Sequence, residues 1–181
     1  MFIAHIPAGY LLANRLSRNH PDRAALIAIG LVAAVFPDTD LFWFYLVDGR
    51  QTAHHAYLFH WPLFWTALAA LALAAARLAH WRRAGRFILV ALIGLMSHMA
   101  LDSVAAAIPW LAPFSAREFG LFEVSPRPGW WVWTFVLHWS FALELAILLA
   151  ACATLWRERA RRNGYSRPAR EIRRTPCQRK K

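Results

Sequence analysis

Charged residues are scarce in this sequence of 181 residues, and acidic residues are the scarcest. Only 17% of the residues are charged, and only ten are Asp or Glu, whereas a soluble domain usually carries about 25% charged residues. Hydrophobic residues make up 59% of the chain, with ten Trp and twelve Phe. Several apolar runs approach the roughly 20 residues that cross a bilayer. The composition therefore excludes an ordinary soluble domain and predicts an integral membrane protein.

Cysteine is also rare, and the features of a signal peptide are missing. The two cysteines, Cys152 and Cys177, show no spacing typical of a metal or redox motif. Residues 1–13 are apolar but contain neither a basic n-region nor a small-residue cleavage site, so we expect no signal peptide there. At ~1.5 Å per residue this segment is too short to span a bilayer alone, and we expect it to form a short N-terminal helix.

The remaining apolar segments predict an all-α, polytopic membrane bundle. We expect about four to five membrane-embedded helices besides the short N-terminal one, with the aromatic segment 41–47 interfacial or re-entrant. The apolar segments are 24–36, 41–47, 61–79, 87–108 and 130–156. This division predicts a membrane-embedded domain over residues 1–156 and a basic, disordered tail over residues 157–181.

The positive charge lies mainly in this tail. The formal net charge of the chain is +11, and residues 157–181 hold nine Arg and two Lys against two Glu, a net charge of +9. The body is therefore nearly neutral, and we expect no nucleic-acid partner. Basic loops face the cytoplasm by the positive-inside rule, which places 15–23, 77–86 and the tail inside. The loops 48–60 and 109–129 then lie on the outer face.

One stretch, residues 36–60, concentrates groups that bind metals. It contains Asp38 and Asp40 directly after Pro37, and then His54, His55 and His60. Two acids beside an apolar run are unfavourable to bury unless a cation compensates them. Oxygen and imidazole ligands suit zinc, manganese or iron. The sequence therefore predicts a divalent metal site.

Other segments bring further candidate ligands to the same depth on the outer side. His98 and Asp102 share one helix face, His5 lies in the N-terminal segment, and His138 lies about two turns beyond the Trp-rich residues 130–133. Alternatives stay open, because His98 and Asp102 could be an interhelical polar pair and the acids at 38 and 40 could cap a helix. Glu144 lies deeper, where pairing with another helix is the default interpretation.

Each candidate has an expected role. Asp40 is either a further ligand or the catalytic base that orients the attacking water, and His54 is interpreted as a neighbour of the ligands. Arg117, a basic residue of the loop after Pro113, is a candidate contact for an anionic substrate, with plain solvent exposure as the alternative. The expected metal ligands are His5, Asp38, His55, His60, His98, Asp102 and His138.

These motifs, in their order and spacing, resemble those of the YdjM-like family of bacterial inner-membrane metal-dependent hydrolases. The resemblance covers roughly residues 1–145 and rests on His5-x-x-x-Gly9, Pro37-Asp38-x-Asp40, His55-x4-His60, Ser97-His98-x-x-x-Asp102 and Pro113-Phe114-Ser115. The family's second loop usually carries polar residues where this chain has Ala56, Phe59 and Trp61, which affects the expected substrate contacts. A more distant likeness is to zinc-dependent phospholipase C and related single-strand nucleases, whose last motif would begin at His138, although Ala142 replaces its acid.

The resemblance implies a protein of the bacterial inner membrane, and the comparison with phospholipase C favours one or two ions, with zinc preferred. The basic loops place the site toward the periplasm and the C-terminus of this multi-pass chain in the cytoplasm. The expected function is metal-dependent hydrolysis of a phosphoester or other ester, and the aromatic residues around the site would suit a lipid-linked substrate. Membrane lipid and an ester substrate are the expected partners. The alternatives are a metal transporter and a protein in which the metal only staples helices together.

Overall fold

The computed structural model describes residues 3–122 and 132–165, and this part of the chain is helical. Ile108 and Phe119 form an isolated β-bridge, and no longer strand occurs in these ranges. The described segments, in chain order, are α1 (His5–Leu16), α2 (Arg23–Ala33), η1 (Phe36–Asp40), α3 (Leu41–Leu46), η2 (His54–Ala56), η3 (Leu58–His60), α4 (Pro62–Leu78), α5 (Ala84–Ala105), α6 (Val132–Val136) and α7 (Ser140–Tyr165).

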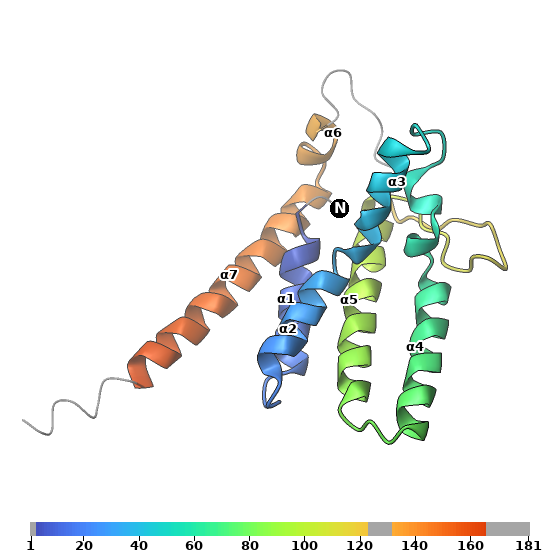
Figure 1. Cartoon of the computed structure of the whole chain (residues 1–181). Helices are drawn as coiled ribbons and strands as arrows, with labels where there is room; N and C mark the ends of the chain where they lie inside the picture. Colours follow the sequence, from blue (N-terminus) through green and yellow to red (C-terminus); the bar gives the residue numbers. More distant parts are fainter. Residues whose placement is uncertain (1–2, 123–131, 166–181) are drawn as a thin grey trace, which may run out of the picture.

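Three helices, α1, α2 and α5, form the centre of the bundle (Figure 1). Each contributes a glycine where the backbones approach: a Cβ atom on Gly9 would lie 2.5 Å from Cβ of Ala34, one on Gly30 would lie 2.4 Å from Cβ of Ala13, and one on Gly94 would lie 2.8 Å from Cβ of Ala33. Small residues permit such close packing between membrane helices. These three close approaches hold α1 and α5 against α2, and so position the site described below.

Pro37 divides the second apolar segment. The axes of Arg23–Ala33 and Phe36–Leu46 differ by 47°, because proline cannot supply the backbone N–H that would continue α2. The 3₁₀ turn η1 fills this bend. The polar residues that follow Pro37 therefore sit at a break between two helices, where their side chains point into the bundle instead of along a regular helix face.

The helix lengths give two candidate membrane spans, Ala84–Ala105 and Ser140–Arg161, or three if the bent pair counts as one span. This number is below the four to five embedded helices predicted from the sequence. Pro37 interrupts one predicted span, and α4 has 17 residues, which corresponds to ~26 Å against a bilayer core of ~30 Å. The expected tail begins at residue 157, but α7 continues as a helix to Tyr165, and residues 166–181 lie outside the described part.

Helix α7 packs mainly against α1 and leans away from the other helices (Figure 1). At its C-terminal end, the guanidinium of Arg23 lies 2.7 Å from Oε1 of Glu158, and the side-chain amide of Asn14 donates to the same oxygen at 3.0 Å. Along its length Leu149 and Trp156 are 67% and 71% exposed, as expected for a helix whose outer face meets lipid.

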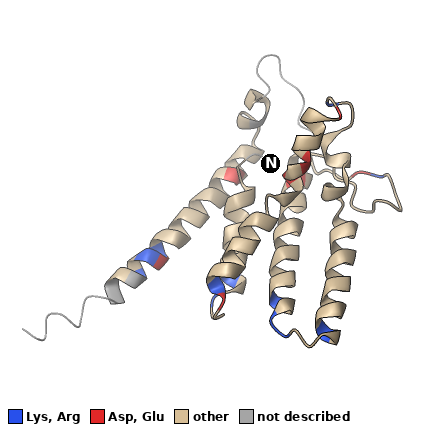
Figure 2. Cartoon of the chain, viewed as in Figure 1, with Lys and Arg blue, Asp and Glu red and all other residues tan. Residues whose placement is uncertain are grey.

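Basic and acidic residues separate along the bundle (Figure 2). The arginines of the α1–α2 turn, the α4–α5 turn and the last turns of α7 lie at one end, whereas η1 and its carboxylates lie toward the other end (Figure 2). Among the described residues, the exceptions to this grouping include the loop arginines Arg50 and Arg117 and, at the basic end, the acids Asp22 and Glu158. By the positive-inside rule, the arginine-rich end would be the cytoplasmic one.

Candidate metal centre

The turn η1 carries Asp38 and Asp40 to the centre of the candidate site. The side chain of Asp40 is 6% exposed and that of Asp38 is 36% exposed. Asp40 occupies the N-cap position of α3 but makes no capping hydrogen bond with its side chain. Both carboxylates instead face histidine rings, so helix capping, the alternative left open from the sequence, does not describe Asp40.

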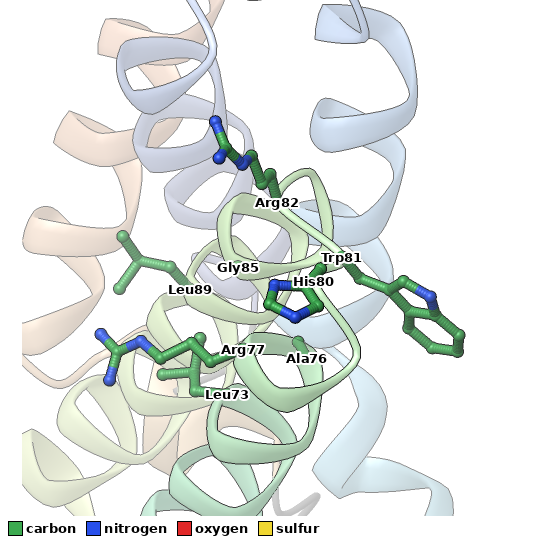
Figure 3. Close-up of a pocket in the computed structure, with 8 residues that line it drawn as sticks. All are labelled: Leu73, Ala76, Arg77, His80, Trp81, Arg82, Gly85 and Leu89. Atoms are coloured by element: carbon green, nitrogen blue, oxygen red, sulfur yellow. The ribbon is translucent and has the colours of Figure 1, made fainter.

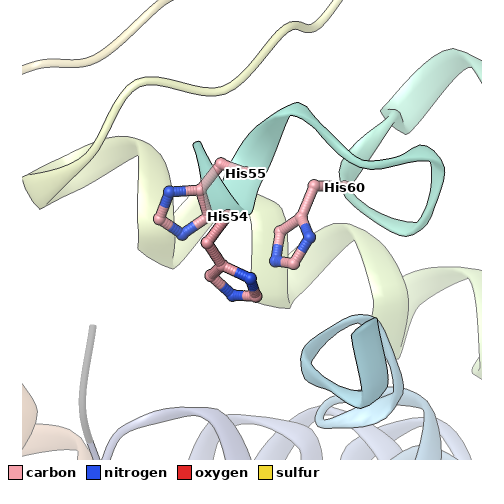
Figure 4. Close-up of side chains that lie close together, drawn as sticks. All are labelled: His54, His55 and His60. Carbon is pink, nitrogen blue, oxygen red and sulfur yellow. The ribbon is translucent and has the colours of Figure 1, made fainter. Parts of the chain in front are cut away.

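The histidines of the following loop gather beside these acids. His54, His55 and His60 come from the short 3₁₀ turns η2 and η3, and their rings lie together with centroid separations of 4.6–4.9 Å (Figure 4). Two indole N–H groups tether the loop, since Trp61 donates to the carbonyl of Ala56 at 3.0 Å and Trp65 donates to that of Phe59 at 2.8 Å. The start of α4 therefore holds the histidine loop in place.

Helices α5 and α1 supply the buried side of the cluster. On α5, Nε2 of His98 lies 3.0 Å from Oδ2 of Asp102, one turn later. In the first turn of α1, Nε2 of His5 lies 3.2 Å from Oδ1 of Asp102, and its ring stacks on His98 with centroids 4.0 Å apart. His98 and Asp102 are therefore neighbours on one helix that also contact other segments, and not a simple interhelical pair.

Glu144 of α7 fixes the N-terminal end of α1. Its Oε2 accepts hydrogen bonds from the backbone N–H groups of Ile3 and Ala4, the latter at 3.2 Å. The first N–H groups of a helix lack intrahelical partners, and a negative charge there is favourable. Glu144, which is 2% exposed, thus pairs with another helix, as expected, and its partner is the backbone directly before His5.

Four ligand atoms from η1, η3 and α5 form a compact set. They are Oδ1 of Asp38, Nε2 of His60, Nε2 of His98 and Oδ2 of Asp102. The two nitrogens are 3.4 Å apart. Nε2 of His60 lies 3.9 Å from Oδ1 of Asp38 and 4.0 Å from Oδ2 of Asp102. Nε2 of His98 lies 3.6 Å and 3.0 Å from the same two oxygens. Ligand atoms about 2.0–2.2 Å from a tetrahedral zinc ion are themselves roughly 3.3–3.6 Å apart. These five separations, 3.0–4.0 Å, are therefore of the size that a divalent cation requires.

The other ring nitrogens define which atoms of His60 and His98 are free to bind. Nδ1 of His98 lies 2.8 Å from the carbonyl oxygen of Ala34, and Nδ1 of His60 lies 2.9 Å from Oδ2 of Asp40. Both partners are acceptors, so in the neutral rings Nδ1 carries the proton and Nε2 carries a lone pair. Metal-binding histidines characteristically donate their second N–H to a carbonyl or carboxylate in this way.

His54 bridges the two acids of η1. Its Nε2 lies 3.3 Å from Oδ1 of Asp38 and its Nδ1 lies 3.1 Å from Oδ1 of Asp40. Burial favours the neutral ring, but the two carboxylates outweigh it and raise the pKa of His54 to about 9. For His60, burial has the larger effect and lowers the pKa of the ring. Two histidines six residues apart therefore have opposite preferences for a proton.

The cluster is closed on the helix side and open on the loop side. His60 and His98 are fully buried and Asp102 nearly so, whereas the side chains of Asp38, His54 and His55 are 36%, 18% and 27% exposed. Nε2 of His55 lies 3.6 Å from Oδ2 of Asp102, so this more exposed ring also reaches the buried acid. A small molecule would therefore approach past the loop that contains η2 and η3.

The structure brings seven of the nine expected site residues together, whereas the other two, His138 and Arg117, lie elsewhere. The seven are His5, Asp38, Asp40, His55, His60, His98 and Asp102. His138 belongs to no group of described residues whose ligand atoms lie within 4.8 Å of one another, because the chain breaks between α6 and α7 and its Nδ1 meets Oγ of Ser140 at 2.8 Å. Arg117 is exposed on the 106–122 loop, and no ion pair to the cluster is found for it within the described ranges.

Two contributors were not predicted from the sequence. His54 was interpreted as a neighbour, yet it contacts both acids of η1 and forms a close group with His55 and His60. Its position next to His55 was the available signal. The carbonyl of Ala34, which orients His98, belongs to the backbone and has no side-chain signature.

A cavity of about 510 Å³ between α4 and α5 has a different character (Figure 3). Its apolar wall includes Leu73 and Leu89, and its polar groups come from Arg77, His80 and Arg82 at the basic end of the bundle. None of its lining residues is a carboxylate. This cavity suits an anion better than a divalent cation, and we do not assign the metal centre to it.

Comparisons with known proteins identify the family. No curated protein and no solved structure matches the chain significantly, so the distant likeness to phospholipase C and the nucleases gains no support. The family described as YdjM inner membrane protein matches residues 1–164, a range that includes α1 to α6 and all but the last residue of α7. The chain belongs to the YdjM family of inner membrane proteins.

Proposed function

We propose that this protein is a membrane-bound, metal-dependent hydrolase of an ester or phosphoester, with its site at the periplasmic face. The observation that carries the proposal is the set of four ligand atoms from Asp38, His60, His98 and Asp102, in which the five separations that involve a histidine nitrogen are 3.0–4.0 Å, as in the shell of a divalent ion. Zinc is favoured by the nitrogen and carboxylate donors, and manganese or iron would accept the same ligands.

The metal would supply the chemistry that the side chains alone lack. A bound Zn²⁺ polarises an ester or phosphoryl oxygen and makes hydroxide available near neutral pH. In the overall reaction, the oxygen of water bonds to the acyl carbon or phosphorus, the bond to the ester oxygen breaks, and the leaving oxygen takes a proton. The residues of the chain must bind the substrate, orient the ligands and handle that proton.

Asp40 and His54 are suited to these supporting tasks. Asp40 is buried and contacts His60 and His54 through its two oxygens, so we assign it the orientation of both rings in place of a role as catalytic base. His54 lies at the open side of the cluster, next to Asp38, where it is placed to exchange a proton with a leaving group. His5 and His55 flank Asp102 and are the candidates for a second ion.

Two other functions fit fewer observations. A metal that only staples helices needs no access, yet Asp38, His54 and His55 line an open side of the cluster. A transporter needs polar groups that continue along the spans. Within the described residues of α5, no acid other than Asp102 occurs, and the acid of α7 nearest to the cluster, Glu144, binds the backbone of α1.

Metal analysis combined with a generic activity assay tests the proposal. Protein purified in detergent should contain one or two divalent ions per chain and should hydrolyse a chromogenic phosphoester or carboxylic ester. Removal of the metal with a chelator should abolish hydrolysis, and zinc should restore it. Metal-loaded, monodisperse protein that hydrolyses neither class of ester would contradict the proposal and would favour the staple or the transporter.

A further inference from the structure

An apolar groove runs along the bundle beside the metal centre. It is a cavity of about 350 Å³ between α2, α4 and α5, and almost no polar atom lines it. Its lining residues are Ala28, Ile29, Val32, Ala33, Phe36, Trp65, Ala91 and Leu95. From Ala91 to His98 along α5 the distance is ~10 Å at the helical rise, so the groove extends by at least this length away from the cluster.

The upper end of the groove lies close in the chain to the candidate metal centre, although no residue of the cluster lines it. Phe36 precedes Asp38 by two residues, Leu95 precedes His98 by one turn, and Ala33 is followed by Ala34, whose carbonyl accepts the hydrogen bond from His98. The walls formed by α2 and α5 therefore end within three residues of a residue of the cluster or of its orienting carbonyl.

The aromatic residues at this end link the groove to the histidine loop. The ring of Phe36 lies 5.3 Å from that of Phe59 and 5.6 Å from that of Trp65 between centroids. Trp65 also donates its indole N–H to the carbonyl of Phe59, the residue before His60. A group that occupied the groove would thus contact the side chain that holds the loop in position.

The location of the groove determines what can fill it. One wall belongs to α5, which is long and apolar enough to span a membrane, and another belongs to α2, the first half of the bent pair. In an inner membrane protein such a groove meets hydrocarbon chains and not water. A groove far from any polar group would hold any bilayer lipid, but the aromatic end of this one contacts Phe59, the residue before His60.

We propose that the groove holds a hydrocarbon chain of the substrate, so that the enzyme hydrolyses an ester or phosphoester of a membrane lipid. This inference rests on the proposed hydrolytic function and specifies its substrate class. The hydrocarbon chain lies in the groove between α2 and α4, and the polar group of the lipid reaches Asp38 from the open side of the cluster, past the loop that contains η2 and η3. Binding of the chain positions the polar group without a contact from Arg117, which is exposed and for which no ion pair to the cluster is found in the described ranges.

Filling the groove tests this inference. The double variant Ala28→Leu/Ala91→Leu adds branched side chains to two facing walls. The control, Ala67→Leu/Ala70→Leu, makes the same change at exposed positions of α4 that do not line the groove. Metal content and elution as a monodisperse species should be unchanged in both variants, which separates groove filling from misfolding.

Two substrates distinguish the groove from the catalytic centre. The filled variant should lose roughly tenfold or more in kcat/KM toward a long-chain fluorogenic lipid ester in vesicles, while a short-chain, water-soluble chromogenic ester should be cleaved within about twofold of the wild-type rate. The control variant should hydrolyse both substrates like the wild type. An equal loss on both substrates, or an equal effect of both variants on the lipid, would overturn the inference.

A binding measurement covers the case in which no hydrolysis occurs. Phosphatidylglycerol with a diazirine in its acyl chain, incorporated into vesicles with the protein, should label peptides of α2 and α5 in the wild type and in the control. Labelling should fall in the filled variant. Unchanged labelling would show that the groove is ordinary lipid-facing surface, whatever the activity assay gives, whereas groove labelling without any hydrolysis would contradict only the proposed function.

Discussion

The Nε2 atoms of His60 and His98 face each other at 3.4 Å, although the two residues lie 38 positions apart in the chain. The Nδ1 atom of each ring already donates, to Asp40 in one case and to the carbonyl of Ala34 in the other. Two lone pairs therefore point into the same small space beside Asp38 and Asp102. Such an arrangement is unfavourable unless a proton or a cation lies between the electron-rich atoms, and the paired donors on the far side are typical of metal ligands.

Replacement of His98 tests this interpretation most directly. His98→Ala should lose most of the bound metal because it removes one of four ligand atoms, while the protein should still accumulate in the membrane because its apolar helices insert regardless. His138→Ala is the matched control, since it removes a histidine that lies outside the cluster. Metal per chain is measured on monodisperse protein. Equal metal content in the two variants would exclude α5 from the site.

The orienting role of Asp40 gives a second prediction. Asp40→Asn removes the negative charge that faces Nδ1 of His60 and His54 but leaves the four ligand atoms in place. Loss of a carboxylate behind a metal-binding histidine typically weakens metal affinity by about 10–100-fold. Competition with a chelator of known affinity measures this change. Glu118, an exposed acid outside the cluster, changed to Gln, should retain wild-type affinity, and complete loss of metal from Asp40→Asn would instead identify Asp40 as a ligand.

The sequence predicted the class of fold and the residue types of the cluster, because both depend on composition and order. Scarce charge and long apolar runs indicate membrane helices, and rare polar residues in such runs must find partners. The number of spans was predicted less well. Whether a short apolar run such as α4 crosses the bilayer, and whether Pro37 bends or ends a helix, depends on packing that a single sequence does not show.

The details of the site show the same limit. His138 was predicted on a continuous helix, but the break between α6 and α7 turns it toward Ser140. His54 was set aside, but the short turns η2 and η3 direct its ring to the acids of η1. Turns of this kind change the direction of each side chain from residue to residue, so spacing alone does not predict which histidines of the loop converge.

Glu144 should matter for stability and not for metal binding itself. Glu144→Ala leaves the backbone N–H groups of Ile3 and Ala4 without their buried acceptor, which should lower the free energy of unfolding by about 1–3 kcal/mol. Thermal unfolding in detergent measures the loss. Glu118→Ala, in an exposed loop, should have no comparable effect. Metal per folded chain should remain near the wild-type value, and its loss would show that the position of His5 in α1 is essential for the ion.

The orientation of the bundle gives the last prediction. The arginines of the α1–α2 and α4–α5 turns lie at the end of the bundle away from η1 (Figure 2), and basic loops stay in the cytoplasm. Reporter fusions at Gln51 and Gly120 should therefore read as periplasmic, and fusions at Arg83 and Lys181 should read as cytoplasmic. Because Gln51 lies three residues before His54 in the loop that opens the cluster, a cytoplasmic signal at Gln51 would place the metal centre inside the cell. The proposed lipid substrate would then have to come from the inner leaflet, and the periplasmic location of the site would be wrong.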